Sequence, residues 1–144
     1  KNIINELTKL NVKIKLITDG DVAGVLSVAD AKSNVDIFMG IGGGPEGVLS
    51  AAALSCMNCQ MQTRLVIQNE KEKFRCKKMG INKLDKKYYI DDMIKGDVIF
   101  CATGVTDGDL VKGIVDKKKE FYSETLVTHR STKYVNIVKT HILK

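Results

Sequence analysis

Acidic residues and glycines gather in three short stretches of the chain. Asp19, Gly20 and Asp21 form the first, residues 42–47 form a glycine-rich second that contains Glu46, and residues 107–109 form an Asp-Gly-Asp third. Carboxylate oxygens are the ligands that Mg²⁺ and similar divalent cations prefer. Glycine allows a close backbone approach, and the N–H groups at a helix start bind phosphate. The three stretches therefore predict phosphate chemistry assisted by a bound cation.

Electrostatics favours a cation in this prediction. Without one, each carboxylate held close to an anionic ligand would repel it by roughly a kcal/mol or more. Each acidic stretch also has a structural explanation, because Asp and Gly are common in turns and Asp often caps helices. The stretch 42–47 is harder to explain in that way, since four glycines in six residues cost conformational entropy on folding.

The elements around these stretches alternate between strand and helix. This alternation predicts an α/β fold: a layered sandwich with a largely parallel sheet flanked by helices and a C-terminal antiparallel hairpin. Because parallel strands end at one edge of a sheet, the three stretches are expected to converge there. We expect helices at residues 1–10, 22–31, 48–57 and 70–79 with a helical turn at 92–95, strands at 12–18, 35–41, 61–68 and 97–103, and the hairpin at 121–129 and 133–143.

Composition limits the class of protein. The 144 residues suit one domain, and the 44% hydrophobic content is enough for a core. No apolar run is long enough for a membrane span and no secretory signal opens the chain, so we expect a cytoplasmic protein without a membrane partner. The net charge of +6 comes from lysines spread along the chain with only three arginines, a pattern that does not favour nucleic acid.

The cysteines and histidines do not form a recognisable metal motif. Cys56 and Cys59 have C-x2-C spacing, but a zinc site would need a second close pair. A redox pair would stand at a helix N-terminus, whereas this pair follows a helical stretch. We therefore expect reduced core cysteines. His129 and His141, on the late hairpin, are expected to be surface or packing residues.

A dinucleotide-binding site is an alternative for the glycine-rich stretch. Gly42-x-Gly44-x-x-Gly47 follows an expected strand, opens a helix and has Glu70 after the next strand, as an NAD-type domain would. Against this hypothesis, Glu46 would lie in the turn that holds a pyrophosphate, and the stretch at 19–21 would have no role. A non-catalytic anion-binding module is a second alternative.

Three motifs together resemble bacterial class II fructose-1,6-bisphosphatase. They are Leu-Ile-Thr-Asp-Gly-Asp-Val-Ala-Gly at 16–24, Met-Gly-Ile-Gly-Gly-Gly-Pro-Glu-Gly-Val-Leu at 39–49, and Ala-Thr-Gly-Val-Thr-Asp-Gly-Asp-Leu at 102–110. They occur in order and cover nearly the whole chain. The resemblance extends to the lithium-sensitive, metal-dependent sugar phosphatases. It implies hydrolysis of the 1-phosphate of fructose 1,6-bisphosphate in gluconeogenesis, and of sedoheptulose 1,7-bisphosphate in some members.

The resemblance also implies roles for individual residues. It implies that Asp19, Gly20, Asp21 and Gly43 contact the sugar phosphate and that Glu46 binds a divalent metal, manganese or magnesium. It assigns no role to the acids at 107 and 109.

The same resemblance implies that much of the catalytic apparatus lies outside this chain. Residues 1–144 are expected to be a single α/β domain, the C-terminal part of a longer phosphatase. The remaining metal carboxylates, and a threonine that positions the attacking water, would belong to the N-terminal half of the same polypeptide. An opening Lys1 in place of Met agrees with a fragment. We assign no catalytic residue to the chain, expect it to be inactive alone, and expect the complete enzyme to be a homo-oligomer.

Overall fold

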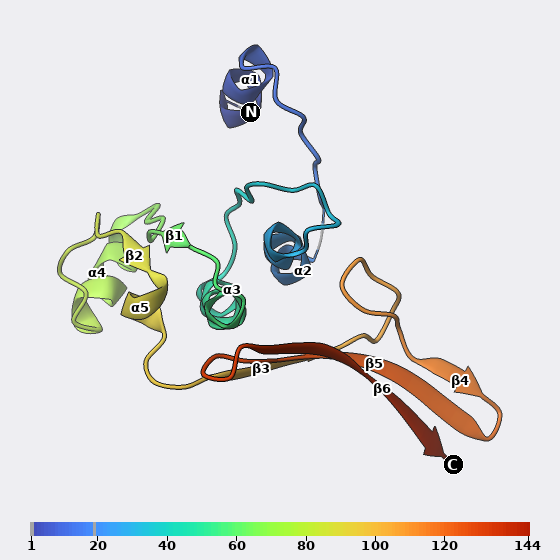
Figure 1. The fold of residues 1–144 in the computed structure, drawn as a ribbon. Helices are drawn as coiled ribbons and strands as arrows, with labels where there is room; N and C mark the ends of the chain where they lie inside the picture. Colours follow the sequence, from blue (N-terminus) through green and yellow to red (C-terminus); the bar gives the residue numbers. More distant parts are fainter. Residues whose placement is uncertain (1, 19) are drawn as a thin grey trace.

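The computed structural model describes the chain except for residues 1 and 19 and the side chain of residue 2. Its elements follow in the order shown in Figure 1. The helices are α1 (Asn2–Lys9), α2 (Asp21–Leu26) with a 3-10 turn η1 (Ser27–Ala29), α3 (Gly44–Cys56), α4 (Glu70–Lys78) and α5 (Ile90–Met93). The strands are β1 (Gln62–Thr63), β2 (Tyr88–Tyr89), β3 (Ile99–Thr103), β4 (Val115–Lys117), β5 (Glu120–His129) and β6 (Tyr134–Leu143).

The long strand β5 organises the larger sheet. It pairs with β6 along its whole length, from Glu120 opposite Leu143 to His129 opposite Tyr134. Its other edge takes β3 and β4 one after the other. β1 and β2 form a separate two-stranded ladder. Every strand pairing in the described part of the chain is antiparallel.

The prediction of a largely parallel sheet is therefore wrong. Residues 12–17 and 35–41 form no strand, and of the expected strand at 61–68 only β1 is paired. The strand at 97–103 exists as β3, but it pairs with the later strand β5 in the antiparallel sense. Apolar alternation indicates an extended backbone, whereas the pairing partner depends on tertiary packing that the pattern does not encode.

Predictions based on local signals fared better. Helices were found close to three of the four long ranges expected, as α1, α3 and α4, and the terminal hairpin is β5–β6. In α4 the Asn69 side chain accepts a hydrogen bond from the Glu72 N–H at 2.9 Å, which caps the helix start. Gly80, which follows the helix, has a φ of +80°, as expected of a residue at a helix end. The helix expected at 22–31 is split into α2 and η1.

The core lies where α2 and α3 meet one face of the sheet. Figure 1 shows α2 and α3 side by side, with α3 above the plane of β3 and β5. Alanines and serines on α3 let it pack closely against its neighbours. The buried apolar cluster joins both helices, the sheet and the loop after β3, and consists of Val25, Leu26, Ala53, Leu54, Phe100, Val111 and Leu126.

The turn between β5 and β6 is held by a polar cluster. Asp97 Oδ2 lies 2.7 Å from His129 Nε2 and accepts a hydrogen bond from Ser131 Oγ at 2.8 Å. Arg130 Nη2 donates to Asp91 Oδ1 at 2.8 Å. Hydrogen bonds from Ser131 and then His129 lower the pKa of Asp97 to about 2. The His141 ring stacks on the Tyr122 ring with 4.6 Å between the ring centroids, so His141 packs on the hairpin while His129 belongs to the hydrogen-bonded turn.

We expect Asp97 to contribute to acid stability. Its pKa is lower folded than unfolded, so its contribution is complete above the ordinary value of 3.8 and is lost as pH falls toward about 2. Asp97→Asn should therefore lower the melting temperature at pH 7 by roughly a few degrees. The gap between wild type and variant should shrink as pH falls from 5 to 2.

Melting curves between pH 7 and pH 2 would check this expectation. Asp36→Asn is the matched control, because Asp36 is exposed and none of the hydrogen bonds or ion pairs of the described residues involves it. Wild-type and Asp97→Asn curves that run parallel over the whole pH range would contradict the assignment.

Candidate functional site

In the first turn of α3, Glu46 lies next to backbone N–H groups that no side chain caps. Gly43 is the N-cap residue, no side chain caps the helix, and Pro45 occupies the first turn. The Glu46 carboxylate bends back over Gly43, so a Cβ at that position would collide with Oε2. Gly43 thus leaves room for the carboxylate next to the helix N-terminus. Backbone N–H groups and an exposed acid stand side by side there.

The start of α2 approaches the same stretch. Gly20 has φ +77° and ψ +43°, a left-handed conformation that suits glycine. Asp21 follows as the first residue of α2, and a Cβ built on Gly42 would stand 3.1 Å from Asp21 Oδ2. Two stretches some twenty residues apart in sequence therefore meet in space. Asp19 lies outside the described residues.

The third acidic stretch belongs to the loop between β3 and β4. Asp107 Oδ1 accepts a hydrogen bond from the Gly113 N–H at 2.9 Å, which closes the loop. Asp109 Oδ2 forms an ion pair with Lys15 Nζ at 3.1 Å, and both side chains are largely exposed. Asp107 therefore has a structural role. Asp109 links this loop to the extended segment that leads into the first acidic stretch.

Helix α2 packs closely on two extended segments, and this packing brings the first acidic stretch next to the glycine-rich stretch. A Cβ on Gly24 would lie 2.5 Å from Ile17 Cδ1 and 2.9 Å from Phe38 Cε2. Gly24 thus allows the segments before Asp19 and before Gly42 to pack against one helix. The sheet is not parallel as predicted, yet Asp21 and the glycine-rich stretch are neighbours, because the segments that lead into them both pack against α2. The signal for Gly24 was a small residue in the middle of a short helical stretch.

The described residues form an incomplete metal site. No group of three or more His, Cys, Asp or Glu side chains among them comes together as a metal centre would require. Glu46 offers one exposed carboxylate, whereas a divalent cation such as Mg²⁺ takes about six oxygen ligands. Two surface hollows, one of them lined by Gln62, Thr63, Arg64 and Lys87, do not include Asp21, Gly43 or Glu46.

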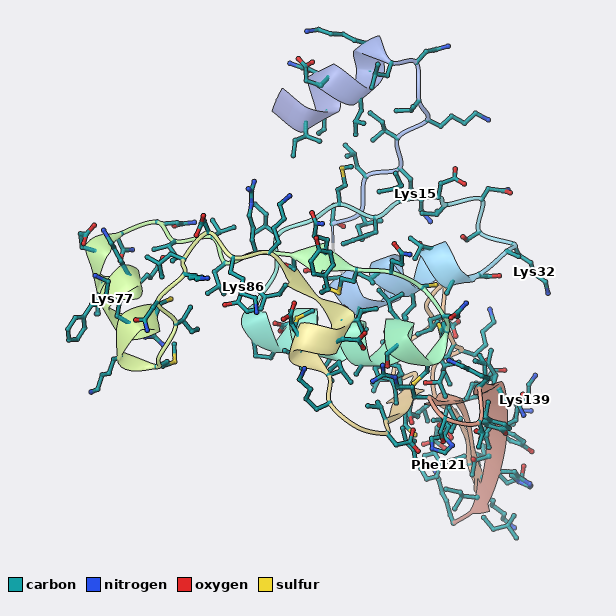
Figure 2. The ribbon with its side chains drawn as sticks, turned by 60° about the vertical axis from the view of Figure 1, so that its left-hand side comes forward. Lys15, Lys32, Lys77, Lys86, Phe121 and Lys139 are labelled. Atoms are coloured by element: carbon teal, nitrogen blue, oxygen red, sulfur yellow. The ribbon has the colours of Figure 1, made fainter. Side chains whose placement is uncertain are left out.

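The lysines and cysteines of the described residues point to no second site. Figure 2 shows Lys15, Lys77 and Lys139 on different sides of the molecule, in agreement with the dispersed charge of the sequence. The four cysteines are free thiols, with Cys56 and Cys76 buried. Burial raises the pKa of the Cys59 thiol, which does not suit a reactive thiolate.

The structure lacks the strand that a dinucleotide-binding motif at Gly42–Gly47 would need. That motif requires a strand that ends at the first glycine, but residues 35–41 form no strand. The Glu46 carboxylate also lies over Gly43, where it would repel a pyrophosphate that binds without a cation.

Comparison with known proteins identifies the family. The family model described as bacterial fructose-1,6-bisphosphatase, glpX-encoded, matches residues 1–142. The chain therefore belongs to the bacterial fructose-1,6-bisphosphatase family, as the three motifs indicated.

The curated relatives belong to the same family, and each is longer than this chain. A protein of Synechococcus sp. (strain JA-3-3Ab), named D-fructose 1,6-bisphosphatase class 2/sedoheptulose 1,7-bisphosphatase, is 34% identical over 99% of this chain and 45% of its own length. A fructose-1,6-bisphosphatase class 2 of Haemophilus influenzae is 33% identical over 96% of this chain and 45% of its own. The chain spans about half the length of these relatives and matches their C-terminal part. Within the described residues no helix is long and apolar enough to cross a bilayer.

Proposed function

We propose that residues 1–144 are the C-terminal, substrate-binding domain of a metal-dependent phosphatase. The complete enzyme hydrolyses the 1-phosphate of fructose 1,6-bisphosphate in gluconeogenesis, and sedoheptulose 1,7-bisphosphate is a further substrate to test. The observation that carries the proposal is the meeting of Asp21 with Gly42, next to the first turn of α3 where Glu46 lies over Gly43. Membership of the family and the names of the two relatives support the substrate class.

The proposed roles follow from the chemistry of each group. Gly43 and the backbone N–H groups at the start of α3 suit the phosphate, because no side chain caps them and they lie at the positive end of a helix dipole. Asp21 and Gly20 begin α2 next to this position and suit contacts with the sugar phosphate. We propose the same contact for Asp19.

Glu46 is the proposed ligand for Mn²⁺ or Mg²⁺. Its carboxylate is exposed and projects next to the proposed phosphate position, where a cation can bridge protein and substrate. A bound divalent cation would supply an activated water and neutralise charge on the phosphoryl oxygens. One carboxylate cannot hold such an ion, so the other ligands must come from polypeptide outside residues 1–144. We therefore propose no catalytic residue within the chain, and we place the complete enzyme in the cytoplasm as a homo-oligomer.

A fusion protein tests this proposal. The part of the Haemophilus influenzae relative that precedes the matched region would be joined to residues 1–144. Release of phosphate from fructose 1,6-bisphosphate would be measured with Mn²⁺ and with EDTA, with the intact relative as positive control. We expect turnover by the fusion that EDTA abolishes, and turnover at least about 100-fold lower for residues 1–144 alone, because the metal site is then incomplete.

Three results would overturn the proposal. One is robust turnover by residues 1–144 alone. Another is a folded fusion without turnover that binds NADH tightly, which would favour the dinucleotide alternative. A fusion that binds inorganic phosphate but has no metal-dependent turnover would instead favour a non-catalytic anion-binding module.

A further inference from the structure

We propose that one side of the molecule is the docking surface for the polypeptide that precedes the matched region in the relatives. This open face consists of α1 and the extended residues 12–17 and 35–42. The inference rests on the proposed function, because it says where the missing half of the metal site is attached.

The extended segments have one packed side and one bare apolar side. Phe38 is half-buried near Gly24, whereas its neighbours Ile37 and Met39 are 69% and 59% exposed. Ile41, on the same side as Ile37 and Met39 in an extended chain, is 82% exposed. In the other segment Ile17 packs near Gly24 and Leu16 is 71% exposed. Such a row of large exposed apolar side chains marks an interaction surface.

The backbone of these segments is available as well. Figure 1 draws residues 12–17 and 35–41 as uncoiled chain, and no strand in the described part of the protein pairs with them. Unpaired extended backbone with apolar side chains readily accepts a further strand. A partner can therefore bind through main-chain hydrogen bonds in addition to apolar contacts.

Helix α1 lacks a partner too. Figures 1 and 2 show it standing away from the other helices at the end of the extended segment. Its apolar residues remain accessible, with Ile3 62% exposed and Leu10, just beyond the helix, 71% exposed. An isolated helix of eight residues is not stable in water, and most helices depend on packing of their apolar face. We infer that α1 is stabilised when the open face is covered.

Several observations identify the occupant. More than half the length of each relative lies outside the match, so a polypeptide of domain size is available. The open face leads directly into Gly42–Glu46 and into the first acidic stretch, so an occupant here can bring its carboxylates to Glu46. A second copy of this chain would not complete the metal site, because its described residues hold no group of three or more His, Cys, Asp or Glu side chains that could bind an ion.

A binding experiment tests the proposal without substrate. The upstream part of the Haemophilus influenzae relative would be produced separately and titrated into residues 1–144 in a calorimeter. We expect a one-to-one complex, weakened at least about 100-fold by the double variant Ile37→Asp and Ile41→Asp, because charge would enter an apolar interface. The matched control, Phe74→Asp with Met79→Asp, places two aspartates on exposed positions at α4 and should change the dissociation constant less than about 3-fold.

If the upstream part does not fold alone, hydrogen exchange in the fusion protein tests the same proposal. In the fusion protein, amides of residues 12–17 and 35–42 should exchange at least about tenfold more slowly than in residues 1–144 by themselves. Equal exchange in the two proteins would overturn the proposal. So would self-association of residues 1–144 that the Ile37→Asp and Ile41→Asp changes abolish, since the occupant would then be a second copy. Either result leaves the phosphatase activity of the fusion as a separate measurement, so the two proposals can fail independently.

Discussion

Glu46→Gln in the fusion protein is expected to lower kcat/KM for fructose 1,6-bisphosphate by about 100-fold or more. The change keeps the size of the side chain but removes the negative charge that we propose binds the cation. Loss even of groups that only support a metal ligand costs about 10–100-fold, so loss of a ligand should cost at least as much. Phosphate release at several Mn²⁺ concentrations measures the effect, and the metal concentration for half-maximal rate should rise.

Glu70→Gln is the matched control for this prediction. Glu70 also stands in the first turn of a helix, on α4, and its side chain is 88% exposed and paired with Lys73. We expect the kcat/KM of the Glu70→Gln fusion to stay within about 2-fold of that of the unchanged fusion. An exposed ion pair of this type contributes little to the stability of the protein. If Glu46→Gln and Glu70→Gln behave alike, Glu46 is not the metal ligand.

Gly104→Ala is expected to destabilise the fold by ~3 kcal/mol. Gly104 is buried, and a Cβ there would collide with the Lys112 backbone carbonyl and lie 3.1 Å from Val111 Cγ2. The Gly104 N–H also donates to the Glu124 carbonyl oxygen at 3.1 Å, which ties this point to β5. Forcing an extra carbon against backbone costs about 1–3 kcal/mol or more, because the backbone cannot rotate away as a side chain can.

Urea unfolding of residues 1–144 measures this effect, and Gly108→Ala is its control in the same loop. A Cβ on Gly108 would lie 3.8 Å from the Val111 carbonyl oxygen, an ordinary contact, so its free energy of unfolding should change by less than about 0.5 kcal/mol. Equal unfolding midpoints for the two variants would show that the loop is looser than the structure describes.

Local signals allowed much of the helical structure to be predicted. The alanine-rich run after Pro45 forms α3. At α4, the Asn69 side chain caps the start of the helix, and Gly80 follows its end with a positive φ. The terminal hairpin was also predictable, because two long alternating runs flank a short polar turn. In each case the signal lies within a few residues of the element.

The sheet was not predictable in the same way, because pairing depends on distant residues. Residues 35–41 have the apolar pattern of a buried strand, but Phe38 packs against α2 while Ile37 and Ile41 face outward. An apolar pattern shows which residues avoid water and does not show what covers them. The docking proposed above would explain this pattern, since the covering surface would be supplied by another part of the complete protein.

The candidate site was predicted in part. Its residue types and their sequence motifs pointed to Glu46, Gly43 and Asp21 as one group, and the structure places Asp21 beside Gly42. The polar cluster around Asp97 could not be foreseen, since Asp97 and His129 are thirty-two positions apart. The structural role of Asp107 was likewise open until its bond to Gly113 was seen.

Crystals of the fusion protein grown with Mn²⁺ and fructose 1,6-bisphosphate would show whether Glu46 binds the metal. Anomalous scattering from manganese would locate the ion. We expect a peak at coordination distance from the Glu46 carboxylate, about 2.0–2.6 Å, with substrate phosphate next to Gly43. Manganese bound elsewhere, with Glu46 in solvent and no phosphate near the start of α3, would contradict this expectation.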